Sequence, residues 1–355
     1  MFQATLGPLI PVLRDRHELS AATAGLLVTG FFAGCLVSTA VGGMLPERFA
    51  RRFLLLGSAG LLVVGTSGLV VPGPWPLPLV GVTVAGLGFG GLVLIVNTAM
   101  AGQEGQRGVT LVNLVNGTYG LGAAAGPALI SITQGGSYPV LFAVFAVVVL
   151  LTLPPRDSAS RVVVTVDAAP RRRLDPTVLL FAGLLFTYAS LETGLSSWEA
   201  VNLRAHGYSP EAAAALTSLF WLGLAGGRLL VPVVTKAWAA PRIIVTSLVG
   251  ALAALTLLVG SVSAPVGFFL VGVFIGPVFP TTLAWIARTL PNPRRVNAMV
   301  ITAAMLGNAS LPALIGYGMQ ATSDLALPGL VALPVVACIL VTLVLSRRTR
   351  VRQGV

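Results

Sequence analysis

Apolar residues in this chain gather in long runs that are separated by short polar connections. The runs fall at 1–13, 21–44, 53–71, 77–101, 109–134, 138–153, 177–203, 212–227, 243–262, 266–287, 296–320 and 325–345. Most exceed the roughly 18 residues that an α-helix needs to cross a hydrocarbon core of about 30 Å. Because backbone groups in lipid must be satisfied within their own segment, we expect helices. The pattern predicts an all-α membrane protein with twelve transmembrane helices.

Basic residues concentrate in alternate connections. With the N-terminus placed in the cytoplasm, only Arg14, Arg16 and Arg204 fall on the outer side, out of 22 lysines and arginines. Basic residues are retained inside during insertion, so the pattern predicts a multi-pass protein of the plasma (inner) membrane with both termini cytoplasmic. The same residues account for the formal net charge of +11. We interpret this charge as an insertion signal that also attracts the lipid bilayer, and we expect no nucleic-acid partner.

An internal repeat divides the chain. Similar pieces recur at a spacing of roughly 190 residues: Leu13-Arg14 with Leu203-Arg204, 122–130 with 307–315, and Gly86 with Gly272. The repeat predicts two pseudo-symmetric six-helix bundles, at 1–153 and 176–346. A polar cytoplasmic linker at 154–175 joins them, and a cytoplasmic tail follows at 347–355. Parallel six-helix halves of this kind carry a solute site near the bilayer midplane, at their interface.

The first predicted helix is shorter than its counterpart in the second half. Its 13 residues would span about 20 Å, less than the hydrocarbon core. Either the natural chain starts upstream of Met1, or this helix crosses only part of the membrane. We expect about ten apolar residues to be missing from the start.

A charged segment on the cytoplasmic side follows the second run. Its members are Gly43, Glu47, Arg48, Arg51 and Arg52. The glycine allows close helix approach, and the acid and arginines can pair with each other and with carbonyl groups at helix ends, which predicts a cytoplasmic latch. The alternative is an ordinary positively charged inner loop. Arg228, expected just after the eighth run, is the corresponding residue of the second half.

The spacing of this latch resembles the signature of the major facilitator superfamily between its second and third helices, with glutamate in place of the usual aspartate. Several pieces further resemble the fucose permease-related sugar transporters: Asn113 to Gly122, Glu192 with Trp198, Phe220-Trp221, and Gly276-Pro277. The resemblance implies the major facilitator fold and alternating access. One departure is Gly7, which stands where that subgroup carries an acid.

Polar residues inside the predicted spans are candidates for the solute and coupling site. Glu192 lies deep in the seventh run, where an ionisable group is costly, so we predict that it couples proton movement to transport. A structural hydrogen bond to a neighbouring helix is the alternative. Amides and indoles suited to sugar hydroxyls and ring faces form the predicted substrate-binding set: Asn97, Asn113, Asn116, Trp198, Trp221 and Asn308. Each asparagine could instead join helices.

These patterns predict a secondary transporter of a small polar solute, a sugar by resemblance, that uses protons and works as a monomer. The alternative function is proton-coupled efflux of drugs or metabolites. An enzyme is not expected, because no run carries a nucleophile, carboxylate pair or metal cluster at one face. Neither a cofactor nor a metal is expected, since Cys35, Cys338, His17 and His206 lie singly.

Overall fold

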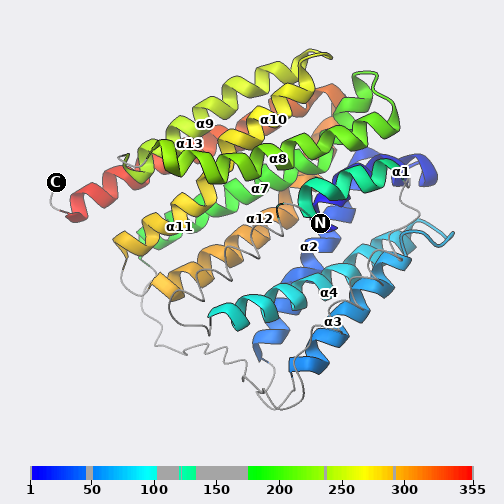
Figure 1. Ribbon diagram of the computed structural model, residues 1–355, viewed down its shortest axis with the longest axis horizontal. Helices are drawn as coiled ribbons and strands as arrows, with labels where there is room; N and C mark the ends of the chain where they lie inside the picture. Colours follow the sequence, from blue (N-terminus) through cyan, green and yellow to red (C-terminus); the bar gives the residue numbers. More distant parts are fainter. Residues whose placement is uncertain are drawn as a thin grey trace. The chain divides into compact units, whose positions relative to one another are not determined.

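The computed structural model describes residues 2–44, 51–101, 120, 122–132, 175–235, 238–290 and 293–353 (Figure 1). All regular structure in these ranges is helical, as predicted. The helices are α1 (Phe2–His17), α2 (Ala21–Met44), α3 (Arg51–Ser67), α4 (Pro76–Ala101), α7 (Pro176–Ala205), α8 (Pro210–Val234), α9 (Ala240–Leu255), η1 (Thr256–Val259), α10 (Ala264–Ile275), α11 (Val278–Thr289), α12 (Pro293–Ala321), η2 (Asp324–Ala326) and α13 (Leu327–Gln353). A further helical segment is Gly122–Ile132. Eight spans in this part of the chain are long and apolar enough to cross a membrane.

The start of α8 follows the local chemistry of the sequence. The Ser209 hydroxyl accepts a hydrogen bond from the amide of Ala212 at 3.2 Å, and Pro210 occupies the first helical position. A capping hydroxyl satisfies one amide of the first turn, and proline needs no partner there. At the start of α7, the Asp175 carboxylate accepts from the amide of Thr177 at 2.9 Å in the same way.

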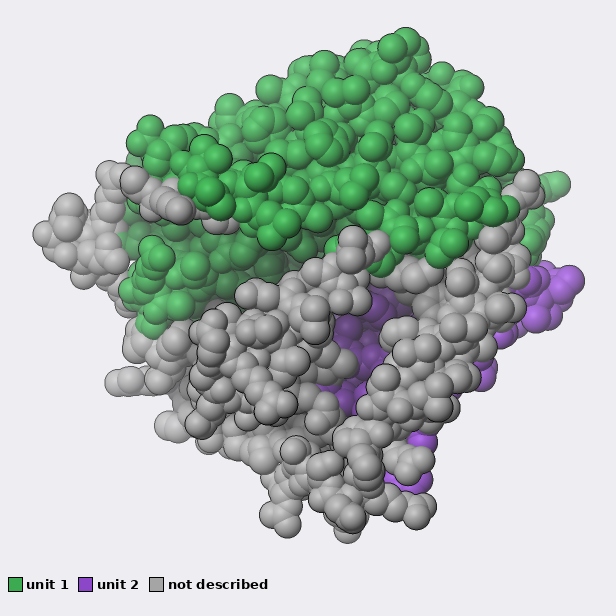
Figure 2. Space-filling view, in the orientation of Figure 1, with its two compact units in different colours: residues 1–25, 120–132, 172–355 green, residues 26–119, 133–171 purple. Residues whose placement is uncertain are grey.

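Contacts divide the chain into two compact units, which Figure 2 colours green and purple. Unit 1 comprises residues 1–25, 120–132 and 172–355, and unit 2 comprises 26–119 and 133–171. Unit 1 therefore holds α1, the first turn of α2, and all helices from α7 onward. The predicted linker at 154–175 lies outside the described residues except for Asp175.

Each unit contains the same helix pair, joined by a close backbone approach. In unit 2, a Cβ added to Gly86 of α4 would lie 2.0 Å from the carbonyl oxygen of Phe31 in α2. In unit 1, a Cβ on Gly272 of α10 would lie 2.3 Å from the carbonyl oxygen of Phe220 in α8. Only glycine permits either contact. Each phenylalanine also meets the next ring in sequence edge-on, at centroid distances of 5.1 and 5.4 Å. The two helix pairs, which hold the repeated Gly86 and Gly272, therefore pack in the same way.

The tenth predicted span is two helices rather than one. α10 ends at Ile275, α11 begins at Val278, and Gly276 and Pro277 lie between them. Proline has no amide hydrogen and its ring clashes with the preceding turn, which accounts for the break. Pro312, by contrast, lies within the continuous α12. A proline therefore interrupts only one of these two spans.

One end of unit 1 brings four connections together. We call it the outer end, because the charge pattern predicts that it faces outward. Here Arg204 of α7 binds Asp15 of α1, and Tyr208 after α7 donates to the carbonyl of Ser261 before α10 at 2.9 Å. Below this end α1 lies tightly on α7, since a Cβ on Gly7 would stand 2.1 Å from the carbonyl oxygen of Ser196. The first turn of α2 similarly rests on α12.

Candidate functional site

An ion pair joins α7 and α8 within their apolar spans. The Arg228 guanidinium lies 3.3 Å from Oε2 of Glu192. Glu192 is about 20 Å along the axis from the end of α7, at a rise of about 1.5 Å per residue, so it lies near the middle of a core of about 30 Å. The side chains of Glu192 and Arg228 are 12% and 32% exposed. A charged pair of this depth is costly to form without mutual neutralisation, and partial exposure leaves it within reach of a solute.

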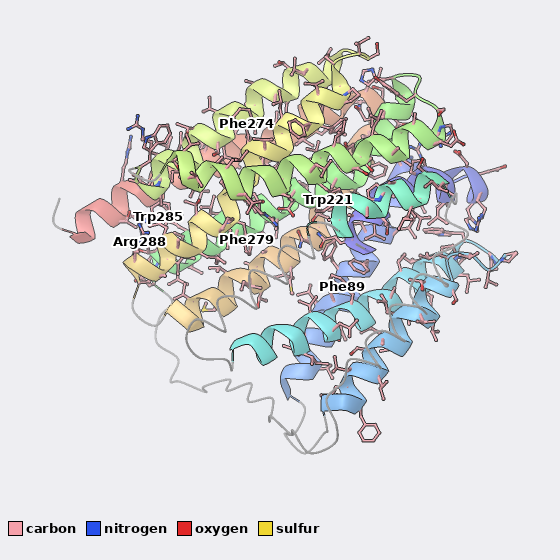
Figure 3. The ribbon with its side chains drawn as sticks, viewed as in Figure 1. Phe89, Trp221, Phe274, Phe279, Trp285 and Arg288 are labelled. Atoms are coloured by element: carbon pink, nitrogen blue, oxygen red, sulfur yellow. The ribbon has the colours of Figure 1, made fainter. Side chains whose placement is uncertain are left out.

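One aromatic side chain contacts the pair, and a second ring packs against the first. The Tyr188 hydroxyl, one turn before Glu192, donates to the same Oε2 at 2.5 Å. Its ring lies 6.2 Å from that of Phe279 on α11, centroid to centroid. Figure 3 labels Phe279 and, on α8, Trp221. A hydroxyl and a guanidinium thus converge on one carboxylate oxygen of Glu192.

Arg228 corrects one sequence-based prediction. We expected it in a cytoplasmic loop just after the eighth span, as a counterpart of the latch. The structure places it within α8, six residues before the end of that helix at Val234. The apolar residues 229–234 that follow Arg228 are the signal that the span continues. The prediction treated every arginine as a loop residue and therefore ended the eighth span before Arg228, whereas it correctly placed Glu192 inside a span.

A second polar contact lies one residue beyond Glu192. The Thr193 hydroxyl donates to Oδ1 of Asn308 on α12 at 2.7 Å. Close approach of the two helices permits this bond, because a Cβ on Gly307 would lie 2.1 Å from the carbonyl oxygen of Phe186. Asn308 remains partly exposed. Its NH₂ group and its second acceptor lone pair are available for further hydrogen bonds.

The two predicted tryptophan ligands are packing residues in this structure. Trp198 is fully buried, and its indole N–H donates to the carbonyl of Pro312 at 2.8 Å, which ties α7 to α12. Trp221 is 2% exposed and meets Phe220 edge-on. Neither indole presents a face to a solute, so the prediction that they line a cavity is wrong for this structure. A tryptophan indole can satisfy its N–H in a protein core as readily as at a binding site.

The remaining predicted site residues lie in parts of the chain that the structure describes incompletely or not at all. Asn113, Asn116, Glu47 and Arg48 lie outside the described residues. For Asn97, Gly43, Arg51 and Arg52 only the backbone is described, as part of α4, α2 and α3.

Charged residues gather at the outer end, where the sequence suggested only a short loop. Arg14 binds Asp324 at 3.1 Å, and Arg204 binds Asp15 at 2.7 Å. Together with Glu18 they line a hollow of about 480 Å³ between α1, α7 and η2. The two arginines are those of the repeated Leu-Arg motif, which could have revealed the site. Among the described residues, no three His, Cys, Asp or Glu side chains are arranged to hold a metal ion.

The family model described as "Major Facilitator Superfamily" matches residues 1–263. This chain belongs to that superfamily. It is therefore a multi-pass membrane transporter of a small solute and not an enzyme. The match does not resolve the fucose permease-related subgroup.

Relatives and solved structures agree with this assignment. The chain is 26% identical over 354 residues to the 3-(3-hydroxy-phenyl)propionate transporter of Escherichia coli, covering 92% of this chain and 86% of that protein. It is 24% identical to sodium-dependent glucose transporter 1 of Xenopus laevis over 361 residues, covering 88% and 72%. A crystal structure of a variant of the nucleoside transporter NupG matches with a TM-score of 0.79 at 11% identity, covering 97% and 96%. That likeness establishes the major facilitator fold.

Proposed function

We propose that this chain is a proton-coupled secondary transporter of a small organic acid, and that Arg228 binds the carboxylate of the solute. The observation that carries the proposal is the partly exposed ion pair between Arg228 and Glu192. Arginine presents a planar fork of donors that matches a carboxylate, and it stays charged under all physiological conditions. In a membrane span such a cation needs an anionic partner at all times.

Exchange of partners at Arg228 would couple the solute to a proton. When Glu192 is ionised it occupies the guanidinium. When Glu192 takes up a proton it becomes neutral, and Arg228 can then exchange this partner for the carboxylate of a solute. Proton and anion therefore favour each other's binding, which is thermodynamic linkage between two sites. The loaded site keeps the same net charge as the empty one, so the low-dielectric surroundings oppose neither state.

The ring of Phe279 favours an aromatic acid. The partly exposed ring of Phe279 offers an apolar face next to the buried Tyr188, whose hydroxyl contacts Glu192, and Asn308 supplies an amide. The Escherichia coli relative is named for a hydroxylated phenylpropionate, which combines a ring, a hydroxyl and a carboxylate. These three groups correspond to the three kinds of side chain at the site.

A neutral sugar is the second candidate. It is favoured by the partly exposed Asn308 amide, by the amides predicted from the sequence and by the glucose transporter among the relatives. Under this reading Glu192 still couples protons, but Arg228 only neutralises it. The two candidates differ in whether the charge of the solute matters.

Binding of matched probes separates the candidates. We would titrate purified full-length protein with 3-phenylpropionate, with its neutral amide and with D-glucose, by calorimetry at pH 6 and pH 7.5. We expect binding of the acid alone, tighter at pH 6. Arg228→Gln should weaken it at least tenfold, while Arg228→Lys should restore part of the affinity and Arg288→Gln, on the exposed end of α11, should leave it unchanged.

Transport by the Glu192→Gln variant tests the coupling. The amide cannot titrate, so in proteoliposomes accumulation of 3-phenylpropionate driven by a pH gradient should be lost, while counterflow without a gradient should persist. Undiminished uphill transport would remove Glu192 from the coupling role. Equal binding of the acid and its amide would overturn the organic-acid proposal, and glucose binding that survives Arg228→Gln would establish the sugar.

A further inference from the structure

Basic residues gather at the end of unit 1 that lies opposite the outer end. They are Arg242 in the first turn of α9, Arg288 in the last turn of α11, and Arg347 and Arg348 near the end of α13. Figure 3 labels Arg288. All four side chains are exposed, and none forms an ion pair with another described residue. We call these four residues, together with Trp238, the basic end.

The contacts of α7 show that these arginines share one end of the unit. Side chains near the outer end of α7 contact the carbonyl oxygens of Leu258 in η1 and Asp324 in η2, at 2.8 and 3.0 Å. At about 1.5 Å per residue, Arg242 lies about 24 Å from Leu258, and Arg347 lies about 30 Å from the start of α13. Since α9 packs against both α11 and α13, the basic residues lie on and around one helix.

Acidic side chains do not neutralise the basic end. The only acid of unit 1 that the structure describes at this end is Asp175, which caps the start of α7 by accepting from the Thr177 amide. The first turn of α9 contains no acid. The other described acids of this unit lie at the outer end or inside α7. Four guanidinium groups therefore present a positive field that favours an anionic ligand.

A stacked tryptophan orders one of the four arginines. The guanidinium carbon of Arg242 lies 4.3 Å from the ring centroid of Trp238, and Trp238 is 38% exposed. This cation–π contact uses the face of the guanidinium, so its N–H donors remain available at the edge. Tryptophan is also enriched where a membrane meets water, because its ring is amphipathic. The pair therefore has the composition expected beside lipid headgroups.

Exposed apolar residues lead up to the basic end on two helices. Val233 and Val234 at the end of α8 are 60% and 79% exposed, and Leu343 and Val344, about one turn before Arg347 on α13, are each 45% exposed. Exposed apolar side chains of a membrane span face acyl chains, so the basic residues begin where those chains end. A ligand with apolar tails and an anionic head matches both surfaces, whereas a free anion matches only the second.

We propose that the basic end binds the headgroup of an anionic phospholipid from the adjoining leaflet, which the charge pattern predicts to be the cytoplasmic one. Arg242, held by Trp238, and the neighbouring Arg347 and Arg348 donate to the phosphate oxygens, a geometry that suits the planar guanidinium. Each basic residue next to a membrane strengthens the binding of anionic lipid by roughly fivefold. The proposal involves neither the solute nor the ion pair at Arg228, so it is independent of the function proposed above.

Lipid retention by the full chain tests the proposal. Purified protein in mild detergent would be titrated with dioleoylphosphatidylglycerol or with dioleoylphosphatidylcholine, and native mass spectrometry would measure the lipid bound. We expect the anionic lipid to bind at least tenfold more tightly. Arg242→Gln and Arg348→Gln should each weaken its binding by roughly fivefold. An excess of inorganic phosphate should leave it bound, because only the lipid also offers acyl chains.

The matched control is Arg16→Gln, which also removes one exposed arginine but from the outer end, and it should leave lipid binding unchanged. As a second readout, phosphatidylglycerol brominated near its headgroup should quench tryptophan fluorescence, and Trp238→Phe should remove most of this quenching. Equal binding of the two lipids, displacement by phosphate, an equal loss in Arg16→Gln and Arg242→Gln, or quenching that persists in Trp238→Phe would each overturn the proposal.

Discussion

The ion pair between α7 and α8 should respond unequally to removal of its two partners. Glu192→Gln removes the α7 counter-ion of Arg228, and a guanidinium cannot lose its proton in a protein. Arg228→Gln leaves Glu192, which can take up a proton and become neutral. We therefore expect Glu192→Gln to be the more destabilising of the two.

The magnitudes follow from the burial of each group. Removing one partner of a buried pair costs about 3–5 kcal/mol of unfolding free energy. Because the Arg228 side chain is 32% exposed, hydration relieves part of that penalty, and we expect about 2 kcal/mol for Glu192→Gln. For Arg228→Gln we expect about 1 kcal/mol, since the neutral acid keeps the Tyr188 hydroxyl close by. The double variant should cost about 1 kcal/mol, which gives a coupling energy of about 2 kcal/mol.

Reversible unfolding in mixed micelles of mild detergent and dodecyl sulfate would measure all four members of this cycle. Because no solute is added, the measured unfolding free energies report on the ion pair and not on solute binding. If the two single variants are equally stable, or if their effects simply add in the double variant, Arg228 and Glu192 are not energetically coupled.

Three further predictions concern packing and topology. Gly227→Ala should destabilise the protein by about 1–3 kcal/mol, because its Cβ would stand 2.0 Å from a backbone carbonyl oxygen of α10. At neighbouring Gly226 the space is open, so Gly226→Ala should cost nothing in a parallel unfolding experiment. Trp198→Phe should destabilise by about 1–3 kcal/mol, since it leaves the buried carbonyl of α12 without its donor; wild-type stability would show that this bond is replaced by water. A single cysteine at the exposed Ser323 should react with an impermeant thiol reagent applied outside intact cells. Labelling only after lysis would reverse the predicted orientation.

Much of the fold could be predicted from hydrophobic patterning alone, because a lipid-spanning helix must be long and almost free of charge. The starts of α8 at Ser209 and of α7 at Asp175 depend on capping by nearby residues. The position of Glu192 well inside α7 follows from the length of the apolar run that contains it. The sequence also contained the Leu-Arg repeat that marks the outer ion pairs. These features depend on residues close together in the chain.

What could not be predicted depends on pairing between distant segments. Arg228 looks like a loop residue until its counter-ion on α7 is known, since an isolated arginine would be excluded from a span. Trp198 and Trp221 are of a residue type that suits sugar binding. Whether each lies in the core or lines a binding site is decided by the neighbouring helices. Pro277 favours a break before α11, but a proline alone does not decide it, because Pro312 lies within the continuous α12.

The ion pair also has a consequence for how the protein enters the membrane. A charged residue at the centre of a lone helix raises the free energy of insertion by about 2.5–3.5 kcal/mol. If the helices left the translocon singly, α7 would carry a penalty of this kind for Glu192, and α8 would carry a smaller one for Arg228, which lies nearer the end of its helix. The connection between them, from His206 to Ser209, is short enough for the two to leave as a hairpin. Glu192 and Arg228 can then neutralise each other before either meets lipid. The unit of biosynthetic insertion in this part of the chain is therefore the helical hairpin, and a ribosome-bound intermediate that ends before Arg228 should hold α7 at the translocon.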